Sequence, residues 1–231
     1  VGPLAGIPLA VKDLEDAAGF VTSHGSAAFA GDAPAGSDSP LVERLRAAGC
    51  IVVGKTNTPE LGWKADTINE IYGATRNPWA LDRSVGGSSG GSAAAIAGGL
   101  VPLATGSAGG GSIRIPSSAA GLSGLKPSLG RVPGGGEAPP GWPLLSSKGP
   151  MARTIRDVVL ALDAVVGPEP TDLSALPLPG ASWTRSLAEL NAPRKVAWSP
   201  TLGFANVDSE VLAVCEAAVA TLASLGTEVV V

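Results

Sequence analysis

The longest stretch without a charged side chain or a histidine covers 30 residues, 84–113. It is long enough for a membrane-spanning helix, but more than half of it is glycine, serine or threonine. Its apolar part, residues 93–104, is interrupted by two glycines and by Pro102, whereas a spanning helix needs about 20 predominantly apolar residues. We therefore predict no membrane span. The clustered glycines indicate a backbone that turns tightly or approaches a ligand closely.

The composition excludes several classes of protein. Of the 231 residues, 45% are apolar and 16% are charged, so the chain can bury a substantial core, and we expect one domain or one domain with an appendage. The 16 basic and 20 acidic side chains give a net charge of −4, and the basic residues form no run that could neutralise a phosphate backbone. We therefore expect no nucleic acid as a partner.

The cysteines and the histidine are too few for a metal or disulfide framework. Cys50 and Cys215 lie far apart in a sequence without a secretory leader, which favours reduced thiols in a cytoplasmic protein. With a single histidine, His24, no Cys/His cluster of metal ligands can be assembled. We expect no metal site.

Helix and strand signals alternate along the chain, which is typical of an α/β domain. Residues 38–49 predict a helix with a capping residue, a proline in its first turn and a glycine stop, and residues 50–54 predict a buried strand. Thr154 and Asp157 resemble a capping box at the start of another helix. A further helix over residues 208–225 is expected to precede a terminal strand.

Two loops rich in glycine and proline interrupt these elements, at residues 134–147 and 167–193. We expect the second to be a linker within a single domain over residues 1–231, leading to a strand–helix–strand unit that begins near Arg194. The chain starts on Val1 and ends on a strand, so we expect material to be missing at both ends.

The possible catalytic bases are few. A Ser-His-Asp hydrolase needs an imidazole to take the hydroxyl proton, and His24 alone could supply it. The alternative is a loop histidine that bonds its neighbours near a turn. Lys12 follows an apolar strand, where burial lowers the pKa of an ammonium group and makes it a base near neutral pH. The alternative for Lys12 is a surface-reaching lysine paired with Asp13 or Glu15.

Two glycine- and serine-rich segments supply further candidates. In residues 86–92 (GGSSGGS), the glycines permit a tight turn before a helix whose first N–H groups suit an anion. A phosphate loop is disfavoured because no lysine follows this turn, and a flexible linker is disfavoured because an apolar helix follows at once. In residues 106–116 (GSAGGGSIRIP), the N–H groups of Gly109, Gly110, Gly111 and Ser112 can converge beside Ser112 Oγ as an oxyanion hole.

The combination of Lys12 with these two segments resembles the amidase signature family. The resemblance extends over nearly the whole chain, and Ser88 and Ser112 lie 24 positions apart. Further motifs follow in the family's order: GKTNTPELG at 54–62, GATRNPW at 73–79, GLKP at 124–127, GR at 130–131 and KGPMAR at 148–153. The resemblance implies an α/β fold whose mixed sheet is covered by helices on both faces, in a compact or truncated form.

The resemblance also implies roles for individual residues. Ser112 would be the nucleophile that forms an acyl-enzyme, Ser88 a bridging serine after a cis peptide bond from Gly87, and neutral Lys12 the base. A lysine too far from the nucleophile needs such a hydroxyl relay. Ser89 would support the site through hydrogen bonds, and the N–H groups of residues 109–112 would hold the oxyanion. No metal or organic cofactor is required.

Two features depart from the family pattern. The family has an aspartate where this chain has Ala108, so Arg114, expected to be a supporting rather than a substrate-binding residue, must find another partner and the oxyanion loop is expected to be looser. Relatives also carry helices before the Lys12 strand and about as much chain again after the last strand. We therefore expect a fragment or a compact variant with an open site.

The function implied is hydrolysis of the C–N bond of small carboxylic amides. Of the five tryptophans, Trp142, in the loop after Ser112, is the one we expect in the substrate pocket. The alternatives are a glutamine-hydrolysing subunit of a tRNA-dependent amidotransferase and a binding module that has lost turnover. A strand edge at residues 229–231 makes a homodimer plausible.

Overall fold

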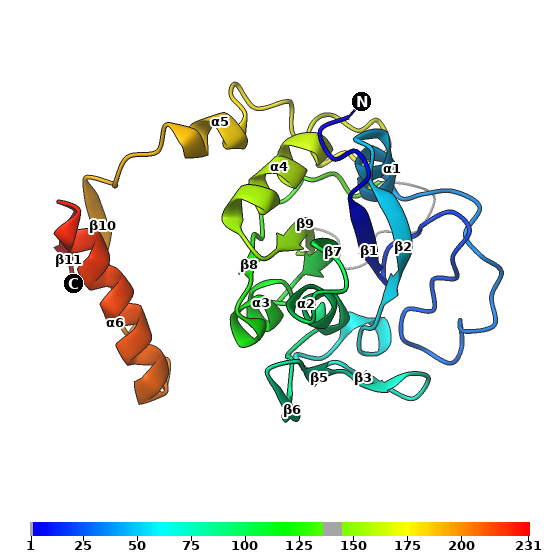
Figure 1. Ribbon diagram of the computed structural model, residues 1–231, viewed down its shortest axis with the longest axis horizontal. Coiled ribbons are helices and arrows are strands. Elements are labelled where there is room, and N and C mark those ends of the chain that lie inside the picture. The colour runs from blue at the N-terminus through cyan, green and yellow to red at the C-terminus, as the bar shows by residue number, and fades with distance from the viewer. Residues whose placement is uncertain (1, 136–144) are drawn as a thin grey trace. The chain divides into compact units, whose positions relative to one another are not determined.

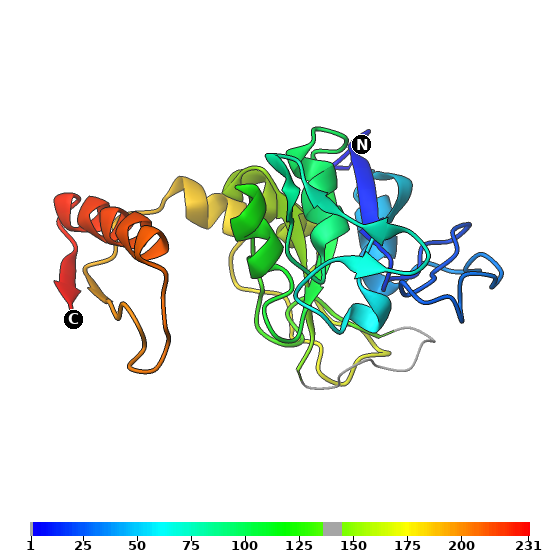
Figure 2. The ribbon, with the colours of Figure 1, turned by 90° about the horizontal axis from the view of Figure 1, so that it is seen from below.

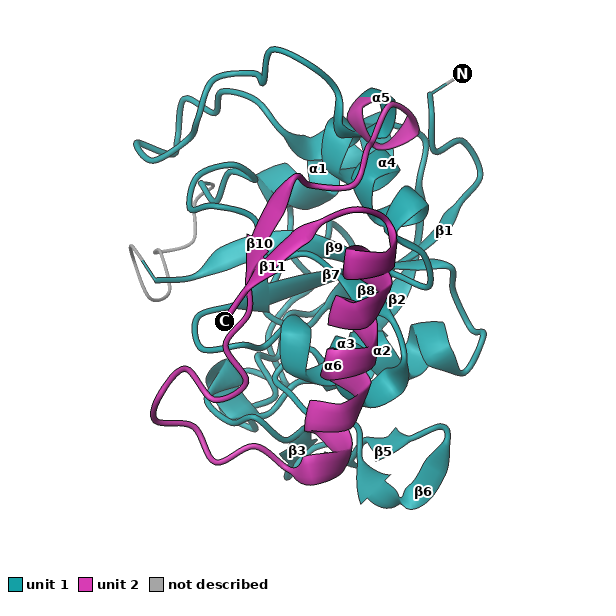
Figure 3. Ribbon diagram, turned by 90° about the vertical axis from the view of Figure 1, so that its left-hand side faces the viewer, with its two compact units in different colours: residues 1–185 teal, residues 186–231 magenta. Residues whose placement is uncertain are grey.

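A computed structural model describes residues 2–135 and 145–231 (Figure 1). The chain forms two compact units, residues 1–185 and residues 186–231, which Figure 3 distinguishes by colour. The boundary falls inside the proline-rich segment 167–193. The assignment of residues 1–231 to a single domain, with that segment as its linker, stays a prediction.

A five-stranded mixed sheet is the centre of residues 1–185. Its strand order is β2-β1-β7-β9-β8. The strands are β1 (Pro8–Lys12), β2 (Ile51–Thr56), β7 (Leu103–Ala108), β8 (Ser123–Gly124) and β9 (Ser147–Ala152). Strand β1 pairs in parallel with β2 and β7, while β9 runs antiparallel to β7 and β8. The mixed sheet implied by the family resemblance is confirmed.

Helices cover both faces of this sheet (Figure 1). Successive strand residues point to opposite faces, so Leu9 and Val11 of β1 enter one apolar cluster while Ala10 enters the other. Helices α1 (Pro40–Ala47) and α4 (Ile155–Val165) contribute to the first cluster. Helix α2 (Gly90–Ala97) contributes to the second, together with Ile113 just before α3 (Arg114–Ala120) and Ala120 at the end of that helix. The end of β1 is therefore enclosed by other elements.

Helix ends follow the local signals, with one difference. Thr154 caps α4 and accepts a hydrogen bond from the N–H of Asp157 at 3.2 Å, as the capping box predicts. Helix α1 begins with Pro40, but its N-terminal residue Ser39 makes no capping hydrogen bond through its side chain. Asp38 accepts from the N–H of Ala18 at 2.7 Å instead, because the preceding loop folds back onto it.

The remaining elements of residues 1–185 are short. They are the 3-10 helix η1 (Glu60–Gly62), strands β3 (Ile68–Asn69), β4 (Gly73–Ala74), β5 (Arg76–Asn77) and β6 (Ala80–Ser84), and helix α5 (Trp183–Ala188), which crosses into the second unit. Strands β3 and β4 form one antiparallel pair, and β5 and β6 form another. They connect β2 to α2.

The second unit is a strand, a helix and a strand, as its sequence predicts. Strands β10 (Lys195–Ala197) and β11 (Glu228–Val230) pair in parallel, and α6 (Ser209–Ser224) connects them. Figure 2 shows α6 alongside the two strands. Asp208 caps the helix by accepting from the N–H of Glu210.

The uncharged stretch 84–113 forms the connections and elements around the end of β1. It contains the turn before α2, the eight-residue helix α2 and strand β7. In the described part of the chain, no helix is both long enough and apolar enough to cross a bilayer. The stretch is built for close packing inside the domain, since most of its side chains are small and buried.

Truncating a core side chain should test this packing. Leu162 of α4 is 1% exposed and belongs to the cluster beneath the sheet, so Leu162→Ala should lower the free energy of unfolding by about 2–5 kcal/mol. Leu190, at 72% exposure, is the control, and Leu190→Ala should change the free energy of unfolding by less than about 0.5 kcal/mol. Urea denaturation measures both. Equal effects would contradict the described core.

Candidate active site

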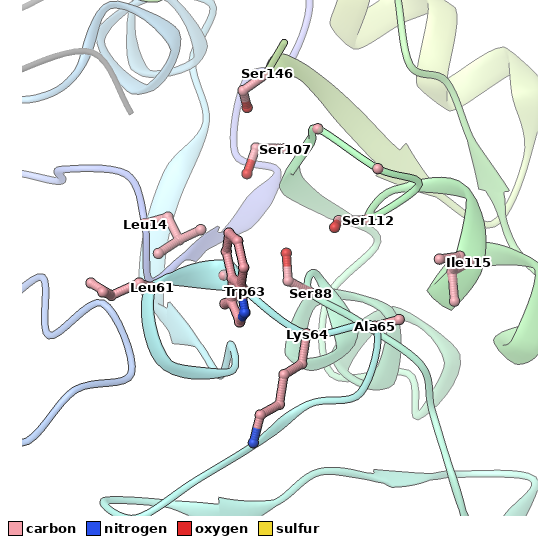
Figure 4. A pocket seen from close by; sticks show the side chains of 13 residues that line it. Leu14, Leu61, Trp63, Lys64, Ala65, Ser88, Ser107, Ser112, Ile115 and Ser146 are labelled. Atoms are coloured by element: carbon pink, nitrogen blue, oxygen red, sulfur yellow. The ribbon is translucent and has the colours of Figure 1, made fainter. Parts of the chain in front are cut away.

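A cavity of about 230 Å³ opens where β1, β7 and the glycine-rich turns meet. Figure 4 shows the hydroxyl groups of Ser88, Ser107 and Ser112 around one space, with Trp63 beside it. The lining residues are Leu14, Leu61, Gly62, Trp63, Lys64, Ala65, Ser88, Ser107, Gly109, Gly110, Ser112, Ile115 and Ser146. The cavity therefore brings together segments that lie far apart in the sequence.

Lys12 is the last residue of β1, and its side chain is fully buried. Its Nζ donates hydrogen bonds to Ser88 Oγ at 2.8 Å, to Ser107 Oγ at 3.0 Å and to the Ser107 carbonyl oxygen at 3.2 Å. Its backbone N–H donates to Thr105 Oγ1 at 2.9 Å. The amine is thus held by hydroxyl and carbonyl oxygens rather than by a carboxylate.

Burial changes the protonation of Lys12. Removing the ammonium from water lowers the pKa of Lys12 from 10.5 to about 7, while the negative charge of Glu15 acts in the opposite direction. Burial is the larger effect. A substantial fraction of Lys12 is therefore neutral near pH 7, which is the state that can accept a proton.

The alternative of a Lys12 ion pair with a neighbouring carboxylate is wrong. Asp13 pairs with Lys55 of β2, at 3.1 Å between Oδ1 and Nζ, and also accepts from Ser23. Glu15 pairs with Lys148 of β9, at 2.7 Å between Oε2 and Nζ. Each carboxylate therefore has a different lysine as its partner.

Ser88 follows a cis peptide bond from Gly87, as the family resemblance implies. Gly86 has a φ of +79°, a conformation that favours glycine, and a Cβ on Gly87 would lie 2.9 Å from backbone atoms of Asp66. The two glycines are needed for the tight turn and the close approach of the chain. Ser88 is nearly fully buried, and its hydroxyl reaches the Lys12 amine.

Ser89 connects three segments of the site. Its N–H donates to the carbonyl of Ser112 at 3.1 Å, and its Oγ donates to the carbonyl of Ser107 at 3.3 Å. Its Oγ also accepts from the Ser107 N–H at 3.4 Å. These bonds tie the turn before α2 to β7 and to the loop after β7.

Ser112 lies in the loop between β7 and α3, partly exposed at the cavity. Gly109 and Gly110 line the same cavity and are exposed. Gly111 has a φ of +120°, which favours glycine. Within residues 2–135 and 145–231, the N–H groups of residues 109–112 find no hydrogen-bond acceptor.

Ser107 and Trp63 are two of the lining residues that the sequence did not single out. Ser107 looks like an ordinary residue of a buried strand, and its proximity to Lys12 depends on the pairing of β1 with β7. Trp63 follows the η1 turn, where Leu61 has a φ of +52°, and stands at the cavity with 71% of its surface exposed. The motif at residues 54–62 was the signal that could have directed attention to Trp63.

The structure bears on the prediction made for His24 but not on the one made for Trp142. His24 packs edge-on against Phe29, with ring centroids 5.3 Å apart, and is not among the residues that line the cavity. Trp142 lies outside the described residues. The described part of the chain holds no group of three His, Cys, Asp or Glu side chains arranged for a metal ion.

The comparisons with known proteins agree with this geometry. The family model described as Amidase matches residues 1–231. The chain belongs to the amidase signature family. It is 43% identical to an acylamidase of Rhodococcus erythropolis over 236 residues, and 40% identical to a 6-aminohexanoate-cyclic-dimer hydrolase of Paenarthrobacter ureafaciens over 247 residues. Each alignment covers 99% of this chain and 48% of the relative.

The fold of this amidase signature chain also matches solved structures. A bacterial aryl acylamidase of the same family superimposes with a TM-score of 0.90 at 33% identity, over 99% of this chain and 47% of that structure. The chain therefore spans about half the length of the relatives it matches.

The departure from the family pattern at Ala108 is visible in the structure. Ala108, at the position where the resemblance to the family leads us to expect an aspartate, is buried at the end of β7. Arg114 is exposed at the start of α3 and, among the described residues, has no hydrogen-bond or ion-pair partner. The expectation that Arg114 must find another partner is therefore not met in this part of the chain.

Lys12 and Cys50 predict opposite pH dependences of stability. Between about pH 7 and 10.5, Lys12 is protonated only in the unfolded chain, so the free energy of unfolding rises by about 1.4 kcal/mol per pH unit. Burial raises the pKa of the Cys50 thiol from 9.0 to about 11, so above pH 9 only the unfolded chain loses that proton and stability falls at a similar slope. We expect stability to rise from pH 7 to 9 and then to level.

Urea denaturation of the protein and of Lys12→Met at pH 7, 8 and 9 measures this effect. The unfolding free energy of the parent protein minus that of Lys12→Met should rise by about 1.4 kcal/mol per pH unit, because only the parent protein contains the buried amine. A constant difference across this range would contradict the low pKa of Lys12.

Proposed function

We propose that this protein is an amidase that hydrolyses the C–N bond of small carboxylic amides through an acyl-enzyme on Ser112. The observation that carries the proposal is the fully buried Lys12, bonded to Ser88 beside a cavity that Ser112 also lines. The names of two relatives, an acylamidase and a cyclic-dimer hydrolase, support amide hydrolysis as the reaction class.

The proposed reaction begins with proton transfer through Ser88. Ser112 Oγ attacks the amide carbon, Ser112 gives its proton to Ser88, and Ser88 gives its own proton to neutral Lys12. The N–H groups of residues 109–112 stabilise the oxyanion. As the C–N bond breaks, Lys12 returns a proton through Ser88 to the departing nitrogen. Water then attacks the acyl group by the same relay and releases the acid.

Ser107 has a specific part in this proposal. A neutral lysine amine has two N–H bonds and one lone pair. The hydroxyl and the carbonyl oxygen of Ser107, at 3.0 and 3.2 Å, can accept the two N–H bonds. The lone pair then faces Ser88 Oγ at 2.8 Å, which is the direction from which the proton arrives. Ser107 is therefore proposed as a positioning residue for the base.

The cavity supports small substrates. Its volume is about 230 Å³, and a neighbouring cavity of about 520 Å³ shares Leu61, Trp63 and Lys64 with it. Leu14, Leu61 and Ile115 give it an apolar wall, and Trp63 adds an aromatic face. We infer small aliphatic or aryl acyl groups as substrates. The names of the relatives favour amide hydrolysis over the amidotransferase and binding-module alternatives. The cytoplasmic location and the homodimer stay predictions.

Replacing the nucleophile should abolish turnover without unfolding the chain. Ser112→Ala should lower kcat/KM for a small anilide by at least about 1,000-fold, because the acyl-enzyme can no longer form. Ser112→Ala should also prevent labelling by a serine-reactive fluorophosphonate. Ser118→Ala, at an exposed serine of α3, is the matched control and should retain both the hydrolysis of the anilide and the labelling. Activity surviving in Ser112→Ala would exclude Ser112 as the nucleophile.

The pH dependence should identify the base. We expect kcat/KM to rise as Lys12 loses its proton, with an apparent pKa of about 7. Lys12→Met should remove this limb and most of the rate. His24→Ala should leave both nearly unchanged, because His24 packs against Phe29 and does not line the cavity. Loss of the limb in His24→Ala would assign the base to the histidine instead.

A further inference from the structure

The ion pair between Lys148 and Glu15 lies next to Lys12 but takes no part in the proposed proton transfer. Lys148 is directly opposite Ser107 in the antiparallel ladder of β7 and β9. Residues opposite each other in such a ladder project their side chains on the same face. The Lys148 ammonium lies 2.7 Å from Glu15 Oε2, and the Glu15 N–H donates to the Lys12 carbonyl at 2.9 Å. One cation and one carboxylate therefore border the strand end that carries Lys12.

This pair is largely withdrawn from water. The side chain of Glu15 is 4% exposed and that of Lys148 is 22% exposed. Charges in such surroundings are screened less than charges at the surface, so they act on each other and on their neighbours over several ångströms. The Glu15 charge favours the protonated form of Lys12 and raises its pKa, and Lys148 opposes that influence by neutralising Glu15.

The other elements packed around Lys12 offer few competing charges. Strand β7 and helix α2 contain no charged residue. Strand β2 contributes Lys55, which pairs with Asp13. Among the described carboxylates, Glu15 is the one whose charge acts on the Lys12 amine.

Two further charged groups lie close to the Lys148 strand. Burial raises the pKa of the Asp172 carboxyl, but hydrogen bonds from Ser174 and Gly134 and, to a smaller extent, the charge of Lys148 lower it below its usual value. Lys126 donates to the carbonyl of Pro127 at 2.6 Å and to Ser147 Oγ of β9 at 3.5 Å. Neither acts on Lys12 as directly as Glu15 does, because Glu15 lies in the turn that follows β1.

We propose that Lys148, by neutralising Glu15, sets the pH range in which Lys12 is unprotonated and thus the pH range of the reaction. As a statement about rate, this rests on the proposed function. As a statement about the protonation of Lys12, it stands independently of any turnover. Lys148 touches neither substrate nor reacting atoms, so it is a positioning residue that acts through Glu15 on the base.

Substitutions of Lys148 and of Glu15 should shift the pH profile of kcat/KM in opposite directions. Lys148→Met leaves Glu15 uncompensated, which stabilises the protonated amine and moves the rising limb of kcat/KM to higher pH by about one unit. From a pKa of about 7, that shift is about a five-fold loss of kcat/KM at pH 7 and no loss at pH 10. Glu15→Gln should move the limb to lower pH by a similar amount.

Profiles of kcat/KM from pH 5 to 10, measured with 4-nitroacetanilide, test these shifts. Lys148→Arg keeps the charge and should restore the parent profile. The double variant Glu15→Gln/Lys148→Met removes both charges, and its limb should lie between those of the single variants. Opposite shifts are the decisive feature, because general damage to the fold would lower the rate at every pH. Shifts in the same direction would overturn the proposal.

Lys55→Met is the matched control. It also removes the cation from a buried lysine–carboxylate pair beside β1, but its carboxylate, Asp13, is not among the charges that act on the Lys12 amine. We expect the rising limb of the kcat/KM profile of Lys55→Met to stay within about 0.3 pH units of the limb of the parent protein. A shift as large as that of Lys148→Met would show that any charge near β1 acts alike, and the specific role of Lys148 would be lost.

A direct titration separates this proposal from the proposed function. The Cε resonance of Lys12, identified by its disappearance in Lys12→Met, reports the protonation of the amine by NMR without any substrate. An upward shift of its midpoint in Lys148→Met, together with a downward shift in Glu15→Gln, supports the charge coupling even if no amide is hydrolysed. An unchanged midpoint in both variants, in a protein whose Ser112-dependent hydrolysis is intact, overturns the coupling and leaves the amidase function standing.

Discussion

The burial of the Lys12 amine is the constraint on which the rest of this site depends. A fully buried ammonium is costly, and the protein lowers that cost by letting the amine lose its proton near neutral pH and by surrounding it with oxygen acceptors. Those acceptors come from Ser88 and Ser107, on two different segments. Holding both segments around one nitrogen requires the tight turns and small side chains that dominate residues 84–113.

The absence of charge in residues 84–113 has a chemical consequence as well as a steric one. This stretch supplies Ser88, Ser107 and Ser112 together with the glycines of the proposed oxyanion hole, and it introduces no carboxylate that could fix Lys12 in its protonated form. Ser89 joins the two glycine-rich segments by donating its N–H to the Ser112 carbonyl. One segment thus provides the serine of the proposed relay, the candidate nucleophile and the means of holding them together.

The carboxylates near the base are kept from it by other cations. Asp13 and Glu15 follow Lys12 almost directly, yet they pair with Lys55 and Lys148 from two other strands. If either carboxylate contacted the Lys12 amine, the ammonium form would be stabilised and Lys12 could not act as the proposed base at neutral pH. The arrangement of strands around β1 is therefore also an arrangement of charges around the base.

The sequence alone determined the features that depend on local chemistry. The capping pair Thr154 and Asp157, the helix–strand alternation and the glycines before Ser88 and Ser112 are readable because periodicity, capping and backbone freedom act over a few residues. The family motifs made the roles of Lys12 and the two serines predictable by resemblance.

Only the tertiary structure decided which groups meet. Ser107 binds the Lys12 amine across 95 positions, and Lys148 reaches Glu15 across 133, because strand pairing brings β1, β7 and β9 together. Burial of Lys12 and the partner choice of Glu15 are properties of that packing. No local pattern encodes them, since a lysine beside acidic residues reads the same in sequence whether it pairs with them or stands apart.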